Sequence, residues 1–428
     1  MKNTRCLRPL TLILSVLLAG NLHAELLVLN ADRMFDATRG EMIEPATIVI
    51  RDNLVESVNP ENIPENARVI NFGDSTLLPG LIDMHSHVTM DYFTDDFWVT
   101  AFVNETAADW SVRGAKFARL TLDAGFTTVR DLGAWPGFPD VALMRAINRG
   151  DVPGPDVWPA GHAISITGGH CDVTGFAPGI MEMGPKQGIA DGVDEVIKAV
   201  RYQAKHGVRV IKVCATGGVL SFSQNAEIGA LQYSLEELEA IVREARKLGL
   251  KVAAHAHGTE GINTAILAGV SSIEHGSILS DESIDLMIEN GTYLVPQAYI
   301  NEMDMPPETP ASVVEKNEYL KPLVIQSIQK AYAAGVNIAL GTDSGVFAHG
   351  ENGAEFAALV GYGIEPAYAL QMATVFAADL LGVDDRGVIA AGKRADIVAV
   401  SGDPLTNIRT MENVVFVIKD GEIFKNNN

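Results

Sequence analysis

Eight strand-like apolar runs, separated by stretches of helical periodicity, follow one another through the middle of the chain. Strands that alternate with helices in this way predict a parallel sheet with helices packed on it. Eight of them suit a closed (β/α)8 barrel of the TIM type, a fold that needs ~250 residues. The expected strands cover residues 81–88, 127–132, 157–164, 208–215, 251–257, 271–275, 293–299 and 337–342, and expected helices include 235–248, 281–290 and 323–334.

Short strand-like runs also occur at both ends of the chain. They lie at residues 26–29, 46–50 and 76–78, and again at 395–400 and 414–418. Lys419-Asp420-Gly421-Glu422 has the pattern of a hairpin turn. We expect the two ends to pair into one small β-sandwich. The predicted domains are therefore this sandwich, from residues 25–79 plus 386–428, and the α/β barrel of residues 80–385.

Residues 1–24 have the pattern of a bacterial signal peptide. Lys2, Arg5 and Arg8 precede an apolar run at residues 10–20. That run is too short for a membrane-spanning helix, which needs ~20 residues, and Ala24 offers a small residue before a cut. The sequence thus predicts a periplasmic or secreted protein without a membrane anchor after signal cleavage.

The charge and the cysteine content limit the classes of partner and site. The formal net charge is −22, which repels nucleic acid and anionic lipid and leaves a small molecule as the expected partner. Beyond the signal segment only Cys171 and Cys214 remain, too few for a thiolate zinc site. They could form a disulfide in an oxidising compartment. The placement of Cys214 in a predicted buried strand argues against that pairing.

Polar side chains stand at the carboxyl ends of several predicted strands, where a barrel carries its catalytic residues. They are His85, His87, Lys212, His255, His257, His275 and Asp343. His85 and His87 are two residues apart, so both imidazoles point to one side of the strand and can face one metal ion. Each residue alone has a structural explanation, such as an acid paired with Lys212. Their common position indicates a metal site, because burying so many polar groups without a partner is costly.

Two sequence motifs identify a family. The stretch at residues 78–87, LPGLIDMHSH, resembles the opening motif of the metal-dependent amidohydrolase superfamily, and GVIAAGKRAD at 387–396 resembles its closing motif. The resemblance covers nearly the whole chain after residue 24. It is closest to the imidazolonepropionase-like and prolidase-like branch. That branch includes bacterial dipeptidases of Xaa-Pro or Xaa-Arg type, carboxypeptidases and enzymes that hydrolyse the amide of ochratoxin.

The resemblance implies two divalent metal ions. His85, His87 and Asp343 would hold one ion, His255 and His275 would hold the other, and Lys212, carboxylated to a carbamate, would bridge both. His257 competes with His255, and the family pattern favours His255 with His257 behind it. Zinc is the expected ion because imidazole ligands suit it, and manganese or cobalt could replace it.

The implied reaction is hydrolysis of an amide or peptide bond. Two metals would lower the pKa of a bridging water and polarise the substrate carbonyl, so that hydroxide attacks it. Asp343 would act as the general base and pass the proton to the leaving amine. The expected substrate carries a free carboxylate next to the scissile bond, as in dipeptides, carboxypeptidase substrates, N-acyl amino acids or ochratoxin-like amides.

The expected substrate contacts lie in loops after the strands. The resemblance suggests that Tyr233 hydrogen-bonds the scissile carbonyl and that His170 helps to bind the carboxylate, with loop packing as the alternative for both. Arg130 could add positive charge unless Asp131 neutralises it. The segment 303–311, rich in proline and acid, fits either a lid or an ordinary exposed loop.

Two other functions stay open. A cyclic-amide hydrolase of the imidazolonepropionase type is the enzymatic alternative, and predicted export argues against it. A non-catalytic metal-binding barrel is the other, and the complete set of ligand positions argues against it. The sequence leaves the side-chain preference undecided, and it leaves a homo-oligomer open.

Overall fold

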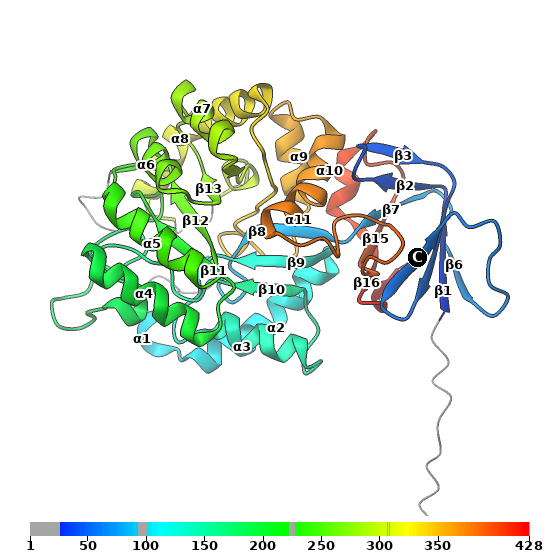
Figure 1. Cartoon of the computed structure of the whole chain (residues 1–428), viewed down its shortest axis with the longest axis horizontal. Coiled ribbons are helices and arrows are strands. Elements are labelled where there is room, and N and C mark those ends of the chain that lie inside the picture. The colour runs from blue at the N-terminus through cyan, green and yellow to red at the C-terminus, as the bar shows by residue number, and fades with distance from the viewer. Residues whose placement is uncertain (1–25, 93–100, 222–226, 306, 308, 428) are drawn as a thin grey trace, which may run out of the picture.

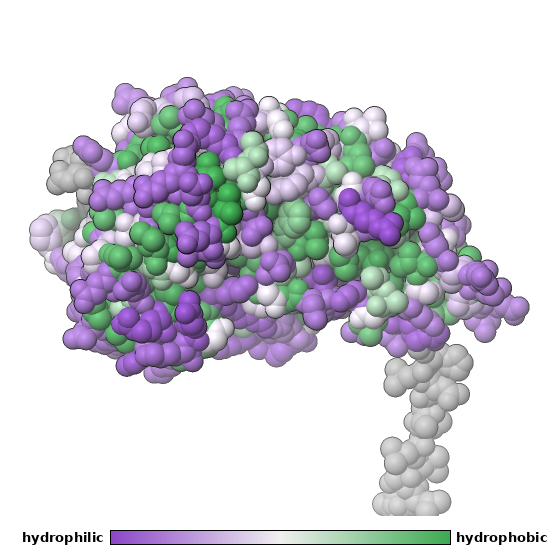
Figure 2. Space-filling model, turned by 45° about the horizontal axis from the view of Figure 1, so that its top comes forward, coloured by the Kyte–Doolittle hydropathy of each residue, from purple (hydrophilic) through white to green (hydrophobic). Residues whose placement is uncertain are grey.

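The computed structural model describes residues 26–92, 101–221, 227–305, 307 and 309–427 (Figure 1). The predicted signal segment lies outside these ranges. Within them, no helix combines the length and the apolar character that a membrane crossing requires. Figure 2 shows hydrophilic residues spread over one face of the molecule with smaller apolar groups between them, as the acidic composition predicts.

Seven of the eight predicted barrel strands form two parallel sheets. The first has the order β10-β9-β8 and the second the order β11-β12-β13-β14. The strands are β8 (Leu81–Ser86), β9 (Phe126–Asp131), β10 (Asp156–Pro159), β11 (Val210–Cys214), β12 (Lys251–Ala256), β13 (Ser272–His275) and β14 (Tyr293–Val295). Their positions confirm the sequence pattern, although several strands end earlier than expected.

The eighth predicted strand, residues 337–342, is wrong as a regular strand. The segment still lies between the two sheets, because Leu294 N donates to Asn337 O (2.9 Å) on one side and Met84 N donates to Leu340 O (2.9 Å) on the other. The ladder breaks because Thr342 N and Asp343 N both donate to His85 O, at 3.1 and 2.6 Å. Residues 337–342 therefore form an isolated bridge with β14 instead of a regular strand.

The opposite edges of the two sheets are also joined by backbone hydrogen bonds. Ile164, which follows β10, donates to Lys212 O and accepts from Cys214 N, each at 2.8 Å. The predicted strand at 157–164 therefore continues beyond β10 as a short bridge to β11.

Helices connect these strands and cover the sheets. In Figure 1, α4, α5 and α6 lie beside β11 and β12. The helices are α1 (Phe102–Asn104), α2 (Ala107–Asp123), α3 (Pro139–Asn148), α4 (Gly192–His206), α5 (Leu235–Lys247), α6 (Thr259–Ala268), α7 (Asp281–Asn290), α8 (Ala311–Ala334), α9 (Ala354–Gly361), α10 (Pro366–Met372) and α11 (Val375–Leu381). Short 3-10 turns occur at η2 (Pro185–Gln187), η3 (Tyr299–Asn301) and η4 (Ile408–Glu412).

Helix α5 shows why the sequence forms these helices. The Ser234 side chain accepts a hydrogen bond from Glu237 N, and the Glu237 carboxylate accepts one from Ser234 N. This reciprocal pair is a capping box. Leu238, Ile241 and Ala245 then recur at helical spacing and are fully buried. The cap fixes where the helix begins, and this apolar stripe fixes the face that packs on the strands.

The two chain ends form two mixed sheets, mostly antiparallel, which share an apolar core. One has the order β5-β4-β1-β6 and the other β17-β16-β15-β7-β2-β3. Their bounds are β1 (Leu26–Ala31), β2 (Arg33–Asp36), β3 (Glu41–Ile43), β4 (Ala46–Arg51), β5 (Leu54–Val58), β6 (Arg68–Asn71), β7 (Ser75–Pro79), β15 (Ile397–Ser401), β16 (Val414–Lys419) and β17 (Glu422–Asn426). Leu29 and Ile48 of the first sheet pack with Leu77, Ile397 and Phe416 of the second. The predicted hairpin between β16 and β17 is confirmed.

Candidate functional site: a histidine-rich cavity

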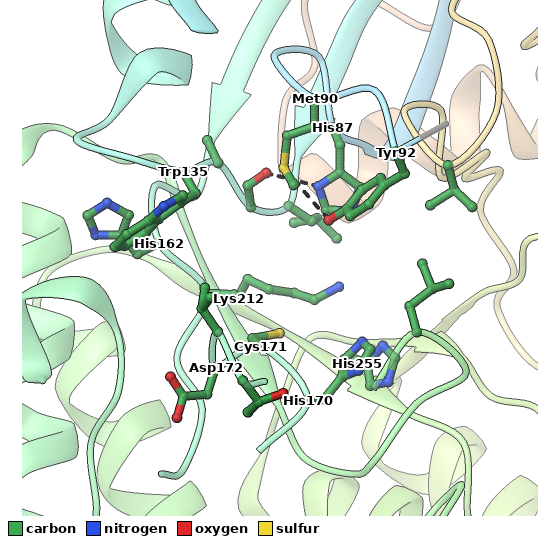
Figure 3. Close-up of a pocket in the computed structure, with 18 of the residues that line it drawn as sticks. His87, Met90, Tyr92, Trp135, His162, His170, Cys171, Asp172, Lys212 and His255 are labelled. Atoms are coloured by element: carbon green, nitrogen blue, oxygen red, sulfur yellow. Dashed lines mark hydrogen bonds between the residues drawn. The ribbon is translucent and has the colours of Figure 1, made fainter. Parts of the chain in front are cut away.

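A cavity of about 590 Å³ opens where the carboxyl ends of the parallel strands meet. The residues predicted as metal ligands all line it: His85, His87, Lys212, His255, His275 and Asp343. In Figure 3, Lys212 extends across the cavity between His87 on one side and His255 on the other. The structure therefore brings together side chains that lie up to 258 positions apart, His85 and Asp343 being the most distant pair.

His85, His87 and Asp343 form the first group, and their potential ligand atoms lie within 4.8 Å of one another. Asp343 Oδ1 is 3.4 Å from His85 Nε2 and 3.1 Å from His87 Nε2. His87 Nδ1 lies 2.9 Å from Gly133 O, so it carries the proton and its Nε2 lone pair faces Asp343. Asp343 adopts a φ of 62°, a strained conformation outside glycine that is typical of functional sites.

His255, His257 and His275 form the second group, again with ligand atoms within 4.8 Å. His275 also has a positive φ, of 69°. His257 Nδ1 is 2.7 Å from Ser277 Oγ, and His257 is not among the residues that line the cavity, whereas His255 is. This placement supports the preference for His255 as the ligand with His257 behind it, which stays a prediction.

Lys212 lies between the two groups. Its Nζ is 3.3 Å from His85 Nε2, and the side chain is almost completely buried. Burial lowers the pKa of Lys212 to about 8, against the opposing effect of Glu274 and Asp343. The uncharged fraction near neutral pH is therefore much larger than for an ordinary lysine, and the uncharged amine is the form that reacts with carbon dioxide.

The donor atoms of this cavity fit divalent metal ions. His255 Nε2 and Asp343 Oδ1 are buried without a hydrogen-bond partner, a condition that typically costs ~1–3 kcal/mol per group. Burial also lowers the pKa of His85, His255 and His275 well below the ordinary value, which keeps them in the neutral form that binds metals. Burial opposes protonation of His87, but Asp343 raises its pKa overall. His87 Nε2 and Asp343 Oδ1, 3.1 Å apart, therefore need a cation between them, either a proton or a metal ion.

His170 lies in the cavity as predicted, but in the neutral state. Burial lowers its pKa to about 3, and His257 adds to the effect. Its ring stacks on His255 with centroids 4.0 Å apart, and Nδ1 lies 2.7 Å from Ser221 Oγ. Gly218 allows this stacking, because a Cβ there would lie 2.6 Å from His170 Cε1. His170 can thus give a carboxylate a hydrogen bond but no positive charge.

Two residues predicted as substrate contacts, Tyr233 and Arg130, are not among the described residues that line the cavity. The Tyr233 hydroxyl is buried and donates to Ala190 O at 2.9 Å, and the residue does not line the cavity. Arg130 is also buried away from the cavity, and it pairs with Glu274 (2.8 Å) instead of Asp131. The reason is the same for both residues: each polar head finds a partner inside the protein, which buried polar groups require.

Cys171 and Cys214 form a disulfide, contrary to the sequence-based expectation. The loop after β10 crosses the carboxyl end of β11, which brings the two Cα atoms to 6.4 Å. Cys171 and the residues that follow it up to Phe176 line the cavity. The bridge therefore ties one wall of the cavity to the strand that carries Lys212.

Replacing both cysteines by serine is expected to lower the free energy of unfolding by about 2–4 kcal/mol, the usual contribution of a disulfide. Denaturant unfolding followed by circular dichroism measures this change. Reducing the unsubstituted protein should produce the same loss and should leave the double variant unaffected. A double variant as stable as the unsubstituted protein would show that the bridge does not form.

The sequence analysis missed several residues around the site. Glu274 and Gln297 both contact His85 Nδ1, at 3.0 and 3.1 Å. A buried acid directly before His275 was the signal that could have identified Glu274. The lining also includes several large apolar side chains, among them Met90, Tyr92, Trp135, Phe176 and Met183. In the segment 303–311, which the sequence left open as a lid or an exposed loop, Pro310 lines the cavity. Residues 306 and 308 of this segment are outside the described residues.

Comparisons with known proteins agree with this site. The profile of the Amidohydrolase family matches residues 76–424. Ochratoxinase of Aspergillus niger is 33% identical over 457 aligned positions, covering 99% of this chain and 92% of the relative. A solved Xaa-Pro dipeptidase with methionine bound in its active site is 38% identical with a TM-score of 0.87, covering 94% of this chain and 100% of its own.

A solved prolidase complexed with N-methylphosphonate-L-proline is 32% identical with a TM-score of 0.82, again covering 94% of this chain and 100% of its own. These proteins represent the prolidase-like and ochratoxinase branch that the two sequence motifs indicated. The chain therefore belongs to the amidohydrolase family and is a hydrolase that acts on amide bonds.

Proposed function

We propose that this chain is an exported, binuclear metal-dependent amidohydrolase that cleaves an amide or peptide bond next to a free carboxylate. The observation that carries the proposal is the placement of Lys212 between two groups of metal-ligating side chains in one cavity. The unpartnered atoms His255 Nε2 and Asp343 Oδ1 belong to different groups, one on each side of Lys212. A single ion would leave one group without a partner, so two ions suit the site better than one.

The architecture that holds this site is a closed (β/α)8 barrel at residues 80–385 and a β-sandwich from residues 25–79 plus 386–428. Support for closure comes from the backbone hydrogen bonds at both edges of the two parallel sheets, through Ile164 and through residues 337–342. Support for the sandwich comes from the apolar core that the two terminal sheets share. Residues 1–24 would act as the signal peptide that exports the chain to the periplasm or the medium.

In this proposal His85, His87 and Asp343 would hold one ion, His255 and His275 would hold the other, and carboxylated Lys212 would be a ligand to both. Zinc is the preferred ion because imidazoles predominate. When bound, the ions supply Lewis acidity, which lowers the pKa of a water molecule and polarises the substrate carbonyl. Asp343 receives the proton of the attacking water at its carboxylate and returns it to the leaving amine.

The electrostatics of Asp343 suit this role. Burial opposes ionisation of the carboxyl group, but His85, His87 and Lys212 together lower its pKa below the usual value. Asp343 is therefore ionised at neutral pH, which is the form that a metal ligand and a proton acceptor both require. Its strained backbone conformation aims the carboxylate at His85 and His87.

The substrate class follows from the cavity and from the relatives. Among the described lining residues, Lys212 is the one lysine and arginine is absent, so the wall is suited to an apolar residue of the substrate. Ser221 Oγ accepts from Gly218 N and lies against His170 Nδ1. When Nδ1 of the neutral ring accepts the Ser221 hydroxyl proton, the single N–H of His170 is on Nε2 and can be donated to a substrate carboxylate. The similarity of the chain to ochratoxinase and to a Xaa-Pro dipeptidase supports a small amide of this kind as the substrate.

Amidation of the substrate carboxylate is expected to reduce kcat/KM by roughly 10- to 100-fold, since a hydrogen bond to a charged group contributes about 1.5–3 kcal/mol. A panel of Xaa-Yaa dipeptides and N-acyl amino acids, each with its C-terminally amidated counterpart, measures the effect. Acetylation of the amino end is the matched control and should change the rate less. Equal rates on the free and amidated forms would contradict the proposal and favour the cyclic-amide hydrolase.

A further inference from the structure

Glu274 is a fully buried carboxylate one residue before His275 in β13. Its Oε1 accepts hydrogen bonds from Arg130 Nη2 (2.8 Å) and from the Ser272 hydroxyl. Its Oε2 lies 3.0 Å from His85 Nδ1, and no described residue gives it a hydrogen bond. One oxygen of the carboxylate is therefore held by Arg130 and Ser272, and the other is left facing the His85 ring.

Arg130 holds this carboxylate in place from the neighbouring part of the barrel. Its Nε donates to Met84 O at 2.6 Å, and its Nη1 donates to Ser272 Oγ at 3.0 Å. All of these groups are buried, and an isolated ion pair in such a place is often no more stable than apolar residues of the same size. Stability of the fold therefore does not by itself explain the buried pair of Arg130 and Glu274.

His85 Nδ1 has a second neighbour, which demands the opposite tautomer. Gln297 Nε2 lies 3.1 Å from Nδ1 and would donate a proton to it, leaving the imidazole proton on Nε2. Nε2 faces Lys212 and Asp343, so a proton there would prevent His85 from binding a metal. A bond from Nδ1–H to the Glu274 carboxylate places the lone pair on Nε2 instead.

Glu274 and Gln297 favour different tautomers of His85, and the stronger of the two interactions with Nδ1 determines which tautomer forms. A hydrogen bond with a charged partner is roughly twice as strong as one between neutral groups. Gln297 also has an alternative, since the same amide nitrogen donates to Val295 O at 2.7 Å. No described residue gives Glu274 Oε2 a hydrogen bond, and His85 Nδ1, at 3.0 Å, is the donor within reach.

We propose that Glu274, supported by Arg130 and Ser272, is a positioning residue that holds His85 with its proton on Nδ1 and its Nε2 lone pair in the cavity. This inference rests on the proposed metal-dependent function. It gives His85 a charged support, whereas His87 is held by the neutral carbonyl of Gly133. Loss of such support behind a metal-binding histidine typically weakens metal binding 10- to 100-fold.

The test compares zinc dissociation constants of the full chain after metal removal, with Glu274→Gln as the main variant. We expect an increase of about 10- to 100-fold for one of the two ions, the one that His85 would bind. Gln297→Met removes the competing neighbour and should leave the constant within about threefold or lower it. Glu355→Gln alters another fully buried carboxylate, which accepts from Ala298 N and Tyr299 N, and should leave zinc binding unchanged.

A second readout follows the tautomer directly. In the metal-free protein with nitrogen-15 histidine, the His85 signal should show the proton on Nδ1 and should change to the other tautomer in Glu274→Gln. If Glu274→Gln does not fold, Ser272→Ala decides, with an expected increase of up to about tenfold in the zinc dissociation constant. Unchanged zinc binding in these variants, with two ions bound to the unsubstituted protein, would overturn this inference alone. An unsubstituted protein that binds fewer than two ions would overturn the proposed function instead.

Discussion

Asp343→Asn is expected to lower kcat by at least ~100-fold, the usual size of a general-base contribution, while KM changes far less. The substitution keeps the size of the side chain and removes the anion that accepts the proton. The carboxylate lies 3.1 Å from His87 Nε2 and 3.4 Å from His85 Nε2, so its role concerns the reacting groups more than the apolar wall that receives the substrate.

Steady-state kinetics on the best substrate of the dipeptide panel measure this effect. Asp281→Asn is the matched control, because Asp281 is an exposed carboxylate at the start of α7 and should leave both constants unchanged. If Asp343→Asn turned over substrate at a near-normal rate, the base would have to be another residue.

Lys212→Ala is expected to lower kcat/KM by more than ~100-fold, which exceeds the loss typical of residues behind a metal ligand. Lys212 lies between the two groups of ligands, so its removal should weaken the binding of both ions. Small carboxylates should partly restore activity, because they can occupy the volume and supply the oxygen atoms of the missing carbamate.

Kinetics with and without added acetate or formate, together with metal analysis of the variant, test this prediction. Lys205→Ala is the matched control, since Lys205 is an exposed lysine in the last turn of α4. Normal activity and normal metal content in Lys212→Ala would refute the role of this lysine.

The strands and the metal-ligating residues could be predicted from the sequence because both are local patterns. Apolar runs mark β8 to β14, and polar residues such as His87 and His275 mark where the strands end at the cavity. The irregular segment 337–342 could not be predicted, because its ladder breaks where Thr342 and Asp343 both bond to His85 O, a residue far away in the sequence.

The differences between expectation and structure concern residues whose partners depend on tertiary structure. Arg130 has the spacing of a strand-end residue, yet it reaches across to Glu274 instead of into the cavity. Tyr233 lies in a loop near the site, but its hydroxyl turns to Ala190 O. The pairing of Cys171 with Cys214 depends on how the loop after β10 crosses β11. No local pattern contains these contacts.

The most direct test of the binuclear site is the metal content of the chain after expression and purification without chelators. Elemental analysis should find two divalent ions per chain, with zinc as the expected element. Removal of the ions should abolish hydrolysis of the dipeptide panel, and addition of zinc should restore it. One ion per chain or none, or hydrolysis that continues at full rate after complete metal removal, would contradict the binuclear mechanism.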